Sequence, residues 1–229
     1  MMYSLLTIKT DYSLLKSMIK VKDLFHLKSP ALGIVDDNLS YVMEFYNLAI
    51  ENNVKPIIGL DILIEDKHLY LYAKNKDGYK NLLNINNLKE ERNITLDDIN
   101  KYQDNIIFLI PYESIDLFNI LNDNKKTIYV SYKNEEEKKN ALLLTNNILY
   151  TKLILCLDKK HTIYLKYLEA ISKGITLEEV TEEYKDFYPE ENIFKEDEET
   201  INKFVSLFDL KFTFDSRYIP SFPGGLELL

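Results

Sequence analysis

Cysteine, tryptophan and histidine are nearly absent from this chain. Its 229 residues include no tryptophan, one cysteine, Cys156, and three histidines, His26, His68 and His161. A single thiol excludes an intrachain disulfide, which suits a reducing compartment such as the cytoplasm. Three imidazoles also leave few ligands for zinc or manganese, which are usually held by imidazole and carboxylate groups.

Positive charge and long apolar runs are scarce as well. The chain has 28 lysines and arginines against 37 aspartates and glutamates, a net charge of −9. Domains that bind nucleic acids alone normally carry a basic face, so this balance argues against that class. No apolar run approaches the roughly 20 residues of a membrane helix. Lys9 and Asp11 interrupt the first apolar run, so we expect no signal peptide, no membrane contact and a cytoplasmic protein.

Common catalytic patterns are also missing. Neither G-x-x-x-x-G-K-[ST] nor G-x-G-x-x-G occurs, which excludes both kinds of glycine-rich phosphate loop. Ser13 and Ser40 have no histidine near them in sequence, and Cys156 lies in an apolar run typical of a core position. The 17 tyrosines and 11 phenylalanines could stack on bases, but without a basic stripe around them core packing is favoured.

What the chain does have is a repeating strand-and-helix pattern, in a length that suits one sizeable core. The apolar runs predict strands at residues 4–8, 31–35, 55–64, 68–73, 106–110, 127–132 and 152–157. The amphipathic stretches predict helices at residues 21–27, 39–52, 76–87, 114–121, 135–147 and 163–172, the last ended by Gly174. Such alternation implies parallel strands with right-handed crossovers, although residues 68–73 could form a hairpin with residues 55–64. This number of repeats favours an α/β barrel over an open sheet.

After Gly174 the composition becomes acidic. Residues 178–199 contain many glutamates and aspartates but only two lysines, Lys185 and Lys195. A solvated face is favoured, while a docking module for a basic partner stays open. Residues 176–210 are predicted to be an acidic helical segment, begun by a capping box at Thr176 and Glu179. Two prolines and two glycines in residues 217–225 predict a linker, so we divide the chain into a barrel domain at 1–215 and a linker at 216–229.

Several segments resemble, in order, the motifs of one family. Residues 7–15, T-I-K-T-D-Y-S-L-L, resemble the first motif of the polymerase-and-histidinol-phosphatase (PHP) domains, which reads H-x-H-S-x-Y-S-L-L in active members. Residues 33–37, G-I-V-D-D, are similar to A-L-T-D-H, and residues 54–61, V-K-P-I-I-G-L-D, to I-K-P-I-I-G-x-E. Residues 73–83, A-K-N-K-D-G-Y-K-N-L-L, resemble the A-K-N-x-x-G-Y-x-N-L-L of polymerase-attached PHP domains. Residues 172–177 and 218–223 resemble two later motifs.

The resemblance implies a distorted seven-stranded β/α (TIM-like) barrel, with its site at the carboxyl ends of the strands. Active members hold two or three metal ions there through histidines and carboxylates. In this chain the corresponding, vestigial metal-site positions are Thr7, Lys9, Asp36, Asp37, Asp61, Leu153 and Leu155. Ser131 stands where the family often has a carboxylate. We therefore expect no catalytic residue and no metal or other cofactor bound by this domain.

The aspartates that remain could still attract magnesium, which accepts carboxylate ligands with water. Lys9, however, should project into the same mouth. We expect its ammonium group to replace the lost metal charge by pairing with Asp36 or Asp61, since a buried carboxylate without a counter-ion is costly. The alternative is that Lys9 extends to solvent. His26, His68 and His161 match no ligand position, and we expect structural or surface roles for them.

The resemblance also implies a function. It favours a non-catalytic, structural PHP domain at the start of the alpha subunit of a replicative DNA-directed DNA polymerase. The polymerase carboxylates and their magnesium would then belong to a core beyond residue 229. Its partners would be the palm and thumb of the same parent chain and, as in some members, a separate proofreading exonuclease, with DNA reached only through the parent protein. The alternative is a metal-dependent phosphoesterase or 3′–5′ exonuclease with a reduced carboxylate centre.

Overall fold

Seven strands form one sheet in the order β1 to β7. The computed structural model describes residues 3–122, 125–190 and 192–212. The strands are β1 (Leu5–Ile8), β2 (Ala31–Ile34), β3 (Lys55–Ile64), β4 (Lys67–Ala73), β5 (Ile106–Ile110), β6 (Thr127–Tyr132) and β7 (Ile148–Tyr150). Six of the seven predicted strands are confirmed to within a residue or two at each end, because their buried apolar side chains are contiguous in the sequence.

The sheet is parallel except around β4. Strands β1, β2 and β3 pair in parallel, as do β5, β6 and β7. Strand β4 runs antiparallel to both of its neighbours. Glu65 and Asp66 join β3 to β4 with φ of 50° and 62°, the left-handed conformation that tight hairpin turns require. The predicted hairpin is therefore confirmed.

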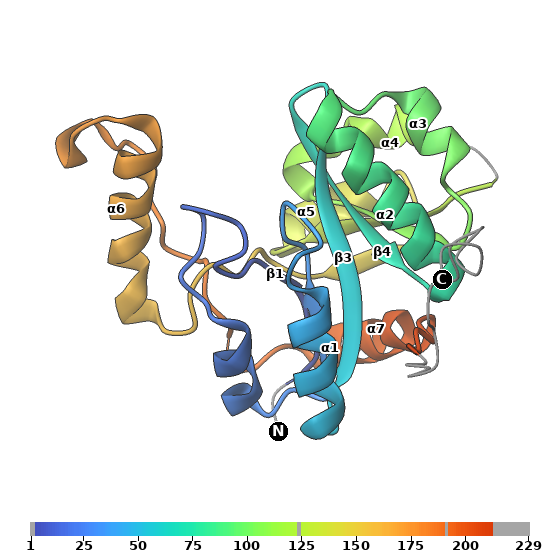
Figure 1. The fold of residues 1–229 in the computed structure, drawn as a ribbon, viewed down its shortest axis with the longest axis horizontal. Helices are drawn as coiled ribbons and strands as arrows, with labels where there is room; N and C mark the ends of the chain where they lie inside the picture. The colour runs from blue at the N-terminus through green and yellow to red at the C-terminus, as the bar shows by residue number, and fades with distance from the viewer. Residues whose placement is uncertain (1–2, 123–124, 191, 213–229) are drawn as a thin grey trace, which may run out of the picture.

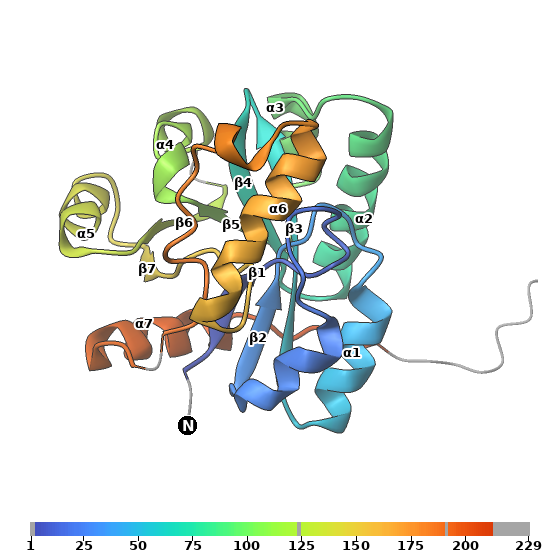
Figure 2. The same ribbon diagram turned by 90° about the vertical axis from the view of Figure 1, so that its left-hand side faces the viewer.

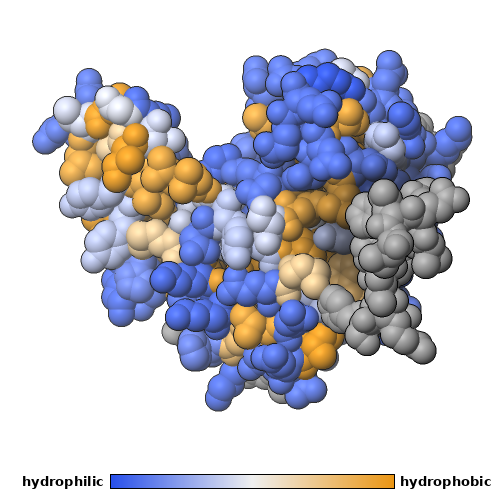
Figure 3. Space-filling model, viewed as in Figure 1, coloured by the Kyte–Doolittle hydropathy of each residue, from blue (hydrophilic) through white to orange (hydrophobic). Residues whose placement is uncertain are grey.

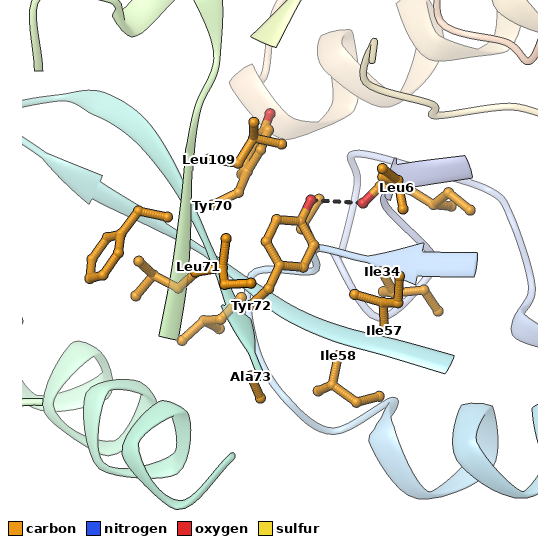
Figure 4. Close-up of a cluster of buried hydrophobic side chains, with 14 of the residues drawn as sticks. Leu6, Ile34, Ile57, Ile58, Tyr70, Leu71, Tyr72, Ala73 and Leu109 are labelled. Atoms are coloured by element: carbon orange, nitrogen blue, oxygen red, sulfur yellow. Dashed lines mark hydrogen bonds between the residues drawn. The ribbon is translucent and has the colours of Figure 1, made fainter. Parts of the chain in front are cut away.

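The sheet curls until strands far apart in its order face each other. The Tyr72 hydroxyl on β4 donates a hydrogen bond of 2.7 Å to the Leu6 carbonyl on β1, across a core of leucine and isoleucine side chains (Figure 4). The two ends of the sheet meet at a parallel bridge between Ile8 and Ile154. There the Lys9 amide donates to the Ile154 carbonyl at 3.0 Å, and the Ile154 amide to the Thr7 carbonyl at 2.9 Å. These contacts confirm the distorted seven-stranded barrel.

The prediction for the last strand is wrong. Residues 152–157 form no strand beyond the bridge at Ile154, and β7 lies earlier, at Ile148–Tyr150. The amides of Leu155 and Cys156 instead donate to the Phe187 carbonyl, at 2.9 and 3.1 Å. Their side chains join Leu165 in a second small core, so the apolar run that suggested a strand covers a helix instead.

Helices lie outside the sheet (Figures 1 and 2). They are α1 (Val42–Glu51), α2 (Lys76–Glu91), α3 (Leu96–Lys101), α4 (Leu117–Leu121), α5 (Glu135–Leu142), α6 (Thr162–Lys173) and α7 (Lys195–Ser206). Single turns or short 3₁₀ helices are η1 (Val21–Leu27), η2 (Tyr112–Ser114), η3 (Lys159–His161) and η4 (Leu177–Glu179). In the described part of the chain, no helix has the length and apolar character needed to cross a membrane.

The helix predictions differ from the structure mainly at their ends. Residues 21–27 form a 3₁₀ rather than an α-helix, with no side chain capping the N-terminus. The helix predicted to reach residue 147 ends at Leu142, because Ala141 is its only buried residue and Leu143 is 84% exposed. Gly174, with φ of 65°, ends α6 as predicted.

The prediction of a helical segment at residues 176–210 is wrong for the middle of that range. Thr176 and Glu179 do form the predicted capping box, but only η4 and α7 are helical. The described residues between them are irregular, because Tyr184, Phe187 and Tyr188 pack over the second core. The predicted linker at 216–229 lies outside the described residues.

Helix α7 completes the main core from the lower side of the sheet in both views (Figures 1 and 2). Phe204 on α7 is fully buried and meets three rings edge-on. The ring centroids lie 5.8 Å from Tyr72, 4.9 Å from Tyr129 and 5.1 Å from Phe208. The sheet therefore depends on α7 for part of its apolar cover.

Replacing Phe204 with alanine should lower the free energy of unfolding by about 3–5 kcal/mol, because it removes a buried ring and leaves a cavity. Urea unfolding followed by circular dichroism measures this change. The matched control is Phe194→Ala, since Phe194 is 73% exposed and should lose little. Equal effects of the two substitutions would contradict the packing described for α7.

Candidate functional site

The carboxyl ends of three neighbouring strands bring the predicted site residues together. Lys9 follows β1, and Asp36 and Asp37 follow β2. Asp61 lies in β3, three residues past the point where Ile34 of β2 pairs with Ile58. Because parallel strands end at the same edge, these four residues share one mouth of the barrel.

Lys9 lies at the centre of this mouth and is only 2% exposed. Its ammonium nitrogen is 2.6 Å from Oδ1 of Asp37 and 2.8 Å from Oδ2 of Asp61. The predicted pairing with Asp61 is confirmed, and the alternative in which Lys9 extends to solvent is wrong. The second partner is Asp37 rather than Asp36.

Asp36 does not need Lys9 because hydroxyl groups surround it. It is fully buried and accepts hydrogen bonds from the Thr10 amide at 2.7 Å, from the Thr10 hydroxyl, and from the Ser13 hydroxyl at 2.6 Å. Burial raises the pKa of Asp36, although the hydrogen bonds from Ser13 and Thr10 act in the opposite direction. Thr10 and Ser13 belong to the same loop that carries Lys9, so one segment both caps and neutralises the mouth.

Three further side chains surround the central ion pairs, and no local motif marks two of them. Lys16 lies 2.9 Å from Oδ2 of Asp37. Lys89 of α2 donates to the backbone carbonyls of Asp37 and Asp61, at 2.5 and 2.8 Å. Nδ1 of His68, on β4, lies 2.8 Å from Oδ2 of Asp61. Lys16 follows the first motif closely, but Lys89 and His68 reach the site only through the fold.

The ion pairs shift the pKa values of their members. Burial alone would lower the pKa of Lys9, but the carboxylates of Asp61 and Asp37 outweigh it and raise that pKa. Burial would raise the pKa of Asp37, but Lys9 and Lys16 outweigh it and lower that pKa to about 2. Burial lowers the pKa of Lys89, which Asp37 and Asp61 offset only in part. Lys9 and Asp37 therefore hold each other in the charged state.

The remaining predicted positions carry no ionisable group. The Thr7 hydroxyl contacts the Thr151 hydroxyl at 2.6 Å and donates to the Lys152 carbonyl at 2.7 Å. Leu153 is half-buried beside the mouth, and Leu155 lies in the second core. The Ser131 hydroxyl accepts a hydrogen bond from the Tyr112 amide at 3.2 Å. Thr7, Ser131 and Leu153, with His68, line a cavity of about 260 Å³.

The other two histidines lie away from these carboxylates. His26 is in η1, and His161 ends η3 just before α6. Both line a different hollow, beside α6. Among the described residues, no group of three or more histidine, cysteine, aspartate or glutamate side chains is arranged to hold a metal ion.

Comparison with known protein families decides the classification. The family model described as "PHP domain" matches residues 6–196. This chain belongs to the PHP domain family. The match runs from within β1 to the start of α7.

Curated relatives of this PHP domain are larger proteins named DNA polymerase III subunit alpha. The protein from Halalkalibacterium halodurans is 29% identical over 120 residues, which are 46% of this chain and 11% of the relative. The one from Staphylococcus aureus is 31% identical over 120 residues, 47% of this chain and 11% of the relative. The one from Ureaplasma parvum is 37% identical over 87 residues, 36% of this chain and 9% of the relative. The matched segments thus span about a tenth of these relatives.

One solved structure also aligns with most of the PHP domain. It is assigned as a metal-dependent phosphoesterase from Bifidobacterium adolescentis, with 11% sequence identity and a TM-score of 0.38. The alignment covers 91% of this chain and 97% of that protein. A likeness at this level carries no argument about activity.

The donors present do not fit the metal centre of an active PHP domain. Three carboxylates remain, and hydroxyl groups already satisfy that of Asp36. The other two, on Asp37 and Asp61, converge on the ammonium nitrogen of Lys9, where a cation would otherwise lie. A divalent ion there would meet the positive charge of Lys9, and the nearby imidazole of His68 already contacts the Asp61 carboxylate.

Removing the Lys9 ammonium should destabilise the PHP domain strongly. Lys9→Met keeps most of the side-chain volume but leaves Asp61 buried without its cation, so the free energy of unfolding should fall by about 3–5 kcal/mol. Denaturant unfolding measures it. The double variant Lys9→Met with Asp61→Asn should recover part of that loss, because the uncompensated charge is gone. A Lys9→Met change of a few tenths of a kcal/mol would rule out the pairing as a source of stability.

The stabilisation by Asp37 should disappear in acid. Its pKa is about 2 in the folded chain, below the ordinary value of 3.8, so the folded state favours the ionised form. At neutral pH the free energy of unfolding of the wild type should exceed that of Asp37→Asn by about 2 kcal/mol. That difference should shrink as the pH falls from about 4 to about 2, since protonated Asp37 no longer attracts Lys9.

Unfolding free energies of both proteins across this pH range test the prediction, and Asp36, present in both, cancels in the difference. The exposed Asp11→Asn variant serves as the control and should track the wild type at every pH. A wild-type advantage over Asp37→Asn that stays constant down to pH 2 would contradict the pairing of Asp37 with Lys9.

Proposed function

We propose that this chain is a structural, non-catalytic PHP domain of a bacterial DNA polymerase III alpha subunit. The observation that carries the proposal is the Lys9 ammonium group, bonded to both Asp37 and Asp61 in the mouth of the barrel. An ammonium group can neutralise two carboxylates, but it cannot polarise a phosphate ester or activate water as a bound metal does. The mouth then contributes stability rather than hydrolysis.

The comparisons support the parent protein in this proposal. The relatives named above are DNA polymerase III alpha subunits, and this chain matches only a small part of each. In the proposed parent, DNA synthesis and its magnesium belong to a polymerase core outside this chain, in the cytoplasm. Residues 1–215 would form the barrel and residues 216–229 the linker to that core.

The proposed partners follow from the assignment of this chain to a polymerase alpha subunit. The barrel would support the palm and thumb of its own parent chain, and a separate proofreading exonuclease is the further candidate. The rival function is a phosphoesterase or exonuclease that uses Asp36, Asp37 and Asp61 alone. These carboxylates are the three that the Lys9 loop already engages.

A metal-dependent nuclease assay separates the two functions. The chain should not degrade single-stranded DNA or hydrolyse a phosphomonoester in the presence of manganese, zinc or magnesium. The reason is that the carboxylates of Asp36, Asp37 and Asp61 already have partners. Elemental analysis should find no stoichiometric transition metal, and a chelator should leave the midpoint of thermal unfolding unchanged.

The controls are the variants Asp36→Asn and Asp11→Asn. Turnover that depends on added metal, persists in Asp11→Asn and disappears in Asp36→Asn would establish the rival function. Turnover that survives both substitutions would point to a contaminating nuclease and leave the structural role standing.

A further inference from the structure

Helix α6 projects from the rest of the molecule and leaves one long face uncovered. It stands apart at the left of Figure 1 and in front of the sheet in Figure 2, with orange, hydrophobic surface on its lobe in Figure 3. Its inner face buries Leu165 and Ala170. Its outer face exposes Ile163, Tyr164, Tyr167 and Ile171 by 51%, 47%, 46% and 66%.

Three aromatic rings form a row along this outer face. The ring of His161 is 6.0 Å from that of Tyr164, which is 6.3 Å from that of Tyr167. The three residues are spaced three apart in sequence, so they are neighbours on the helix surface. In contrast, Tyr41, Tyr70 and Tyr72 are buried in the core. The tyrosine rings of this row are therefore exposed to solvent, whereas the rings of the core tyrosines pack against other side chains.

Two lysines lie at the start of the aromatic row. Lys159 and Lys160 are exposed and directly precede His161, in a chain whose net charge is −9. Lys160 pairs with Asp158 at 3.1 Å. No carboxylate lies within ion-pair distance of Lys159 in the part of the chain that the structure describes. Positive charge thus lies at this end of the row, where it can attract a polyanion.

A hollow of about 470 Å³ opens at the start of the row. His26, His161 and Tyr164 form part of its wall. The rest of the wall is largely apolar, with two carboxylates, Asp23 and Asp158, among its residues. A recess of this size and character can take one flat aromatic group, with polar side chains at its edge.

We propose that the outer face of α6 binds single-stranded nucleic acid. Bases stack on the rings of His161, Tyr164 and Tyr167, and one base enters the adjoining hollow. Lys159 and Lys160 contact the phosphates. Stacking platforms flanked by cations are how proteins bind single strands without reading their sequence. An aromatic row beside lysines favours this ligand over a second protein surface, which would need chiefly the apolar pair Ile163 and Ile171.

This inference goes beyond the structural role proposed above and revises one expectation from the sequence, that the domain meets DNA only through its parent. The sequence shows a net acidic chain with dispersed tyrosines. Only the fold turns the tyrosines of α6 outward and sets lysines beside them. The site lies on α6 and does not use Lys9, Asp37 or Asp61.

Fluorescence anisotropy with labelled oligothymidylate and oligouridylate tests the proposal on the full chain. One or both should bind at low salt, and the preferred oligomer shows whether the site favours thymidylate DNA or uridylate RNA. If two phosphates contact the lysines, the logarithm of the association constant should fall with the logarithm of salt concentration with a slope of about −1.4. The corresponding duplex should bind much more weakly, since its bases are not free to stack.

Two variants separate stacking from charge. Tyr164→Ala with Tyr167→Ala should weaken binding at least about fivefold, whereas Tyr164→Phe with Tyr167→Phe, which keeps both rings, should bind like the wild type. Lys159→Glu with Lys160→Glu should weaken binding and flatten the salt dependence. Phe194→Ala and Lys76→Glu, at an exposed ring and an exposed lysine elsewhere, are the matched controls and should change nothing.

Thermal unfolding of each variant verifies that the fold is retained. Three results would overturn the proposal: no binding of either oligomer at low salt, equal binding by the alanine and phenylalanine pairs, or equal affinity for single strand and duplex. Self-association of the wild type that the alanine pair abolishes, without oligomer binding, would assign the face to a second copy of the chain. Nuclease activity plays no part in these readouts, so the proposed function and this site can fail separately.

Discussion

The ion pairs of Lys9 with Asp37 and Asp61 are the interaction on which the barrel mouth depends. They join the ends of three strands at a point that is almost closed to solvent, since Lys9 and Asp61 are each 2% exposed. A buried carboxylate such as that of Asp61 must be protonated, bound to a metal or paired with a cation. This PHP domain uses a lysine from its own first motif, so the counter-charge is covalently part of the fold.

The groups around the Lys9 ion pairs are arranged so that the remaining charges and carbonyls also have partners. Asp36 would add a third negative charge, but Thr10 and Ser13 hold it with hydrogen bonds. Lys16, in the loop after β1, pairs with the Asp37 carboxylate. Lys89, on α2, donates to the Asp37 backbone carbonyl. Lys9 and Lys16 thus pair with carboxylates, Lys89 with two backbone carbonyls, and Asp36 with hydroxyl groups. An ammonium group supplies positive charge without the Lewis acidity or the exchangeable water of a bound metal ion, which links the geometry to a supporting role.

Much of this could be predicted from the sequence, for physical reasons that also explain the failures. Strands β1 to β6 were predictable because buried apolar runs are local, and Asp61 was a predictable partner of Lys9 because both follow motif positions. Asp37 was missed as a partner, since only the hydroxyl groups around Asp36 decide between the two aspartates. Lys89 lies 52 residues from Asp37 and has no local signal. The run at 152–157 misled because apolar residues that cover a helix resemble those of a strand.

The central claim is that an ammonium group holds the place of a metal ion. Manganese titration followed by nuclear magnetic resonance tests it most directly, because a paramagnetic ion broadens the signals of nearby amides selectively. The account predicts that the amide signals of Lys9, Thr10, Asp37 and Asp61 broaden no more than those of exposed surface residues. Selective broadening of these four signals that saturates with one equivalent of manganese would contradict it.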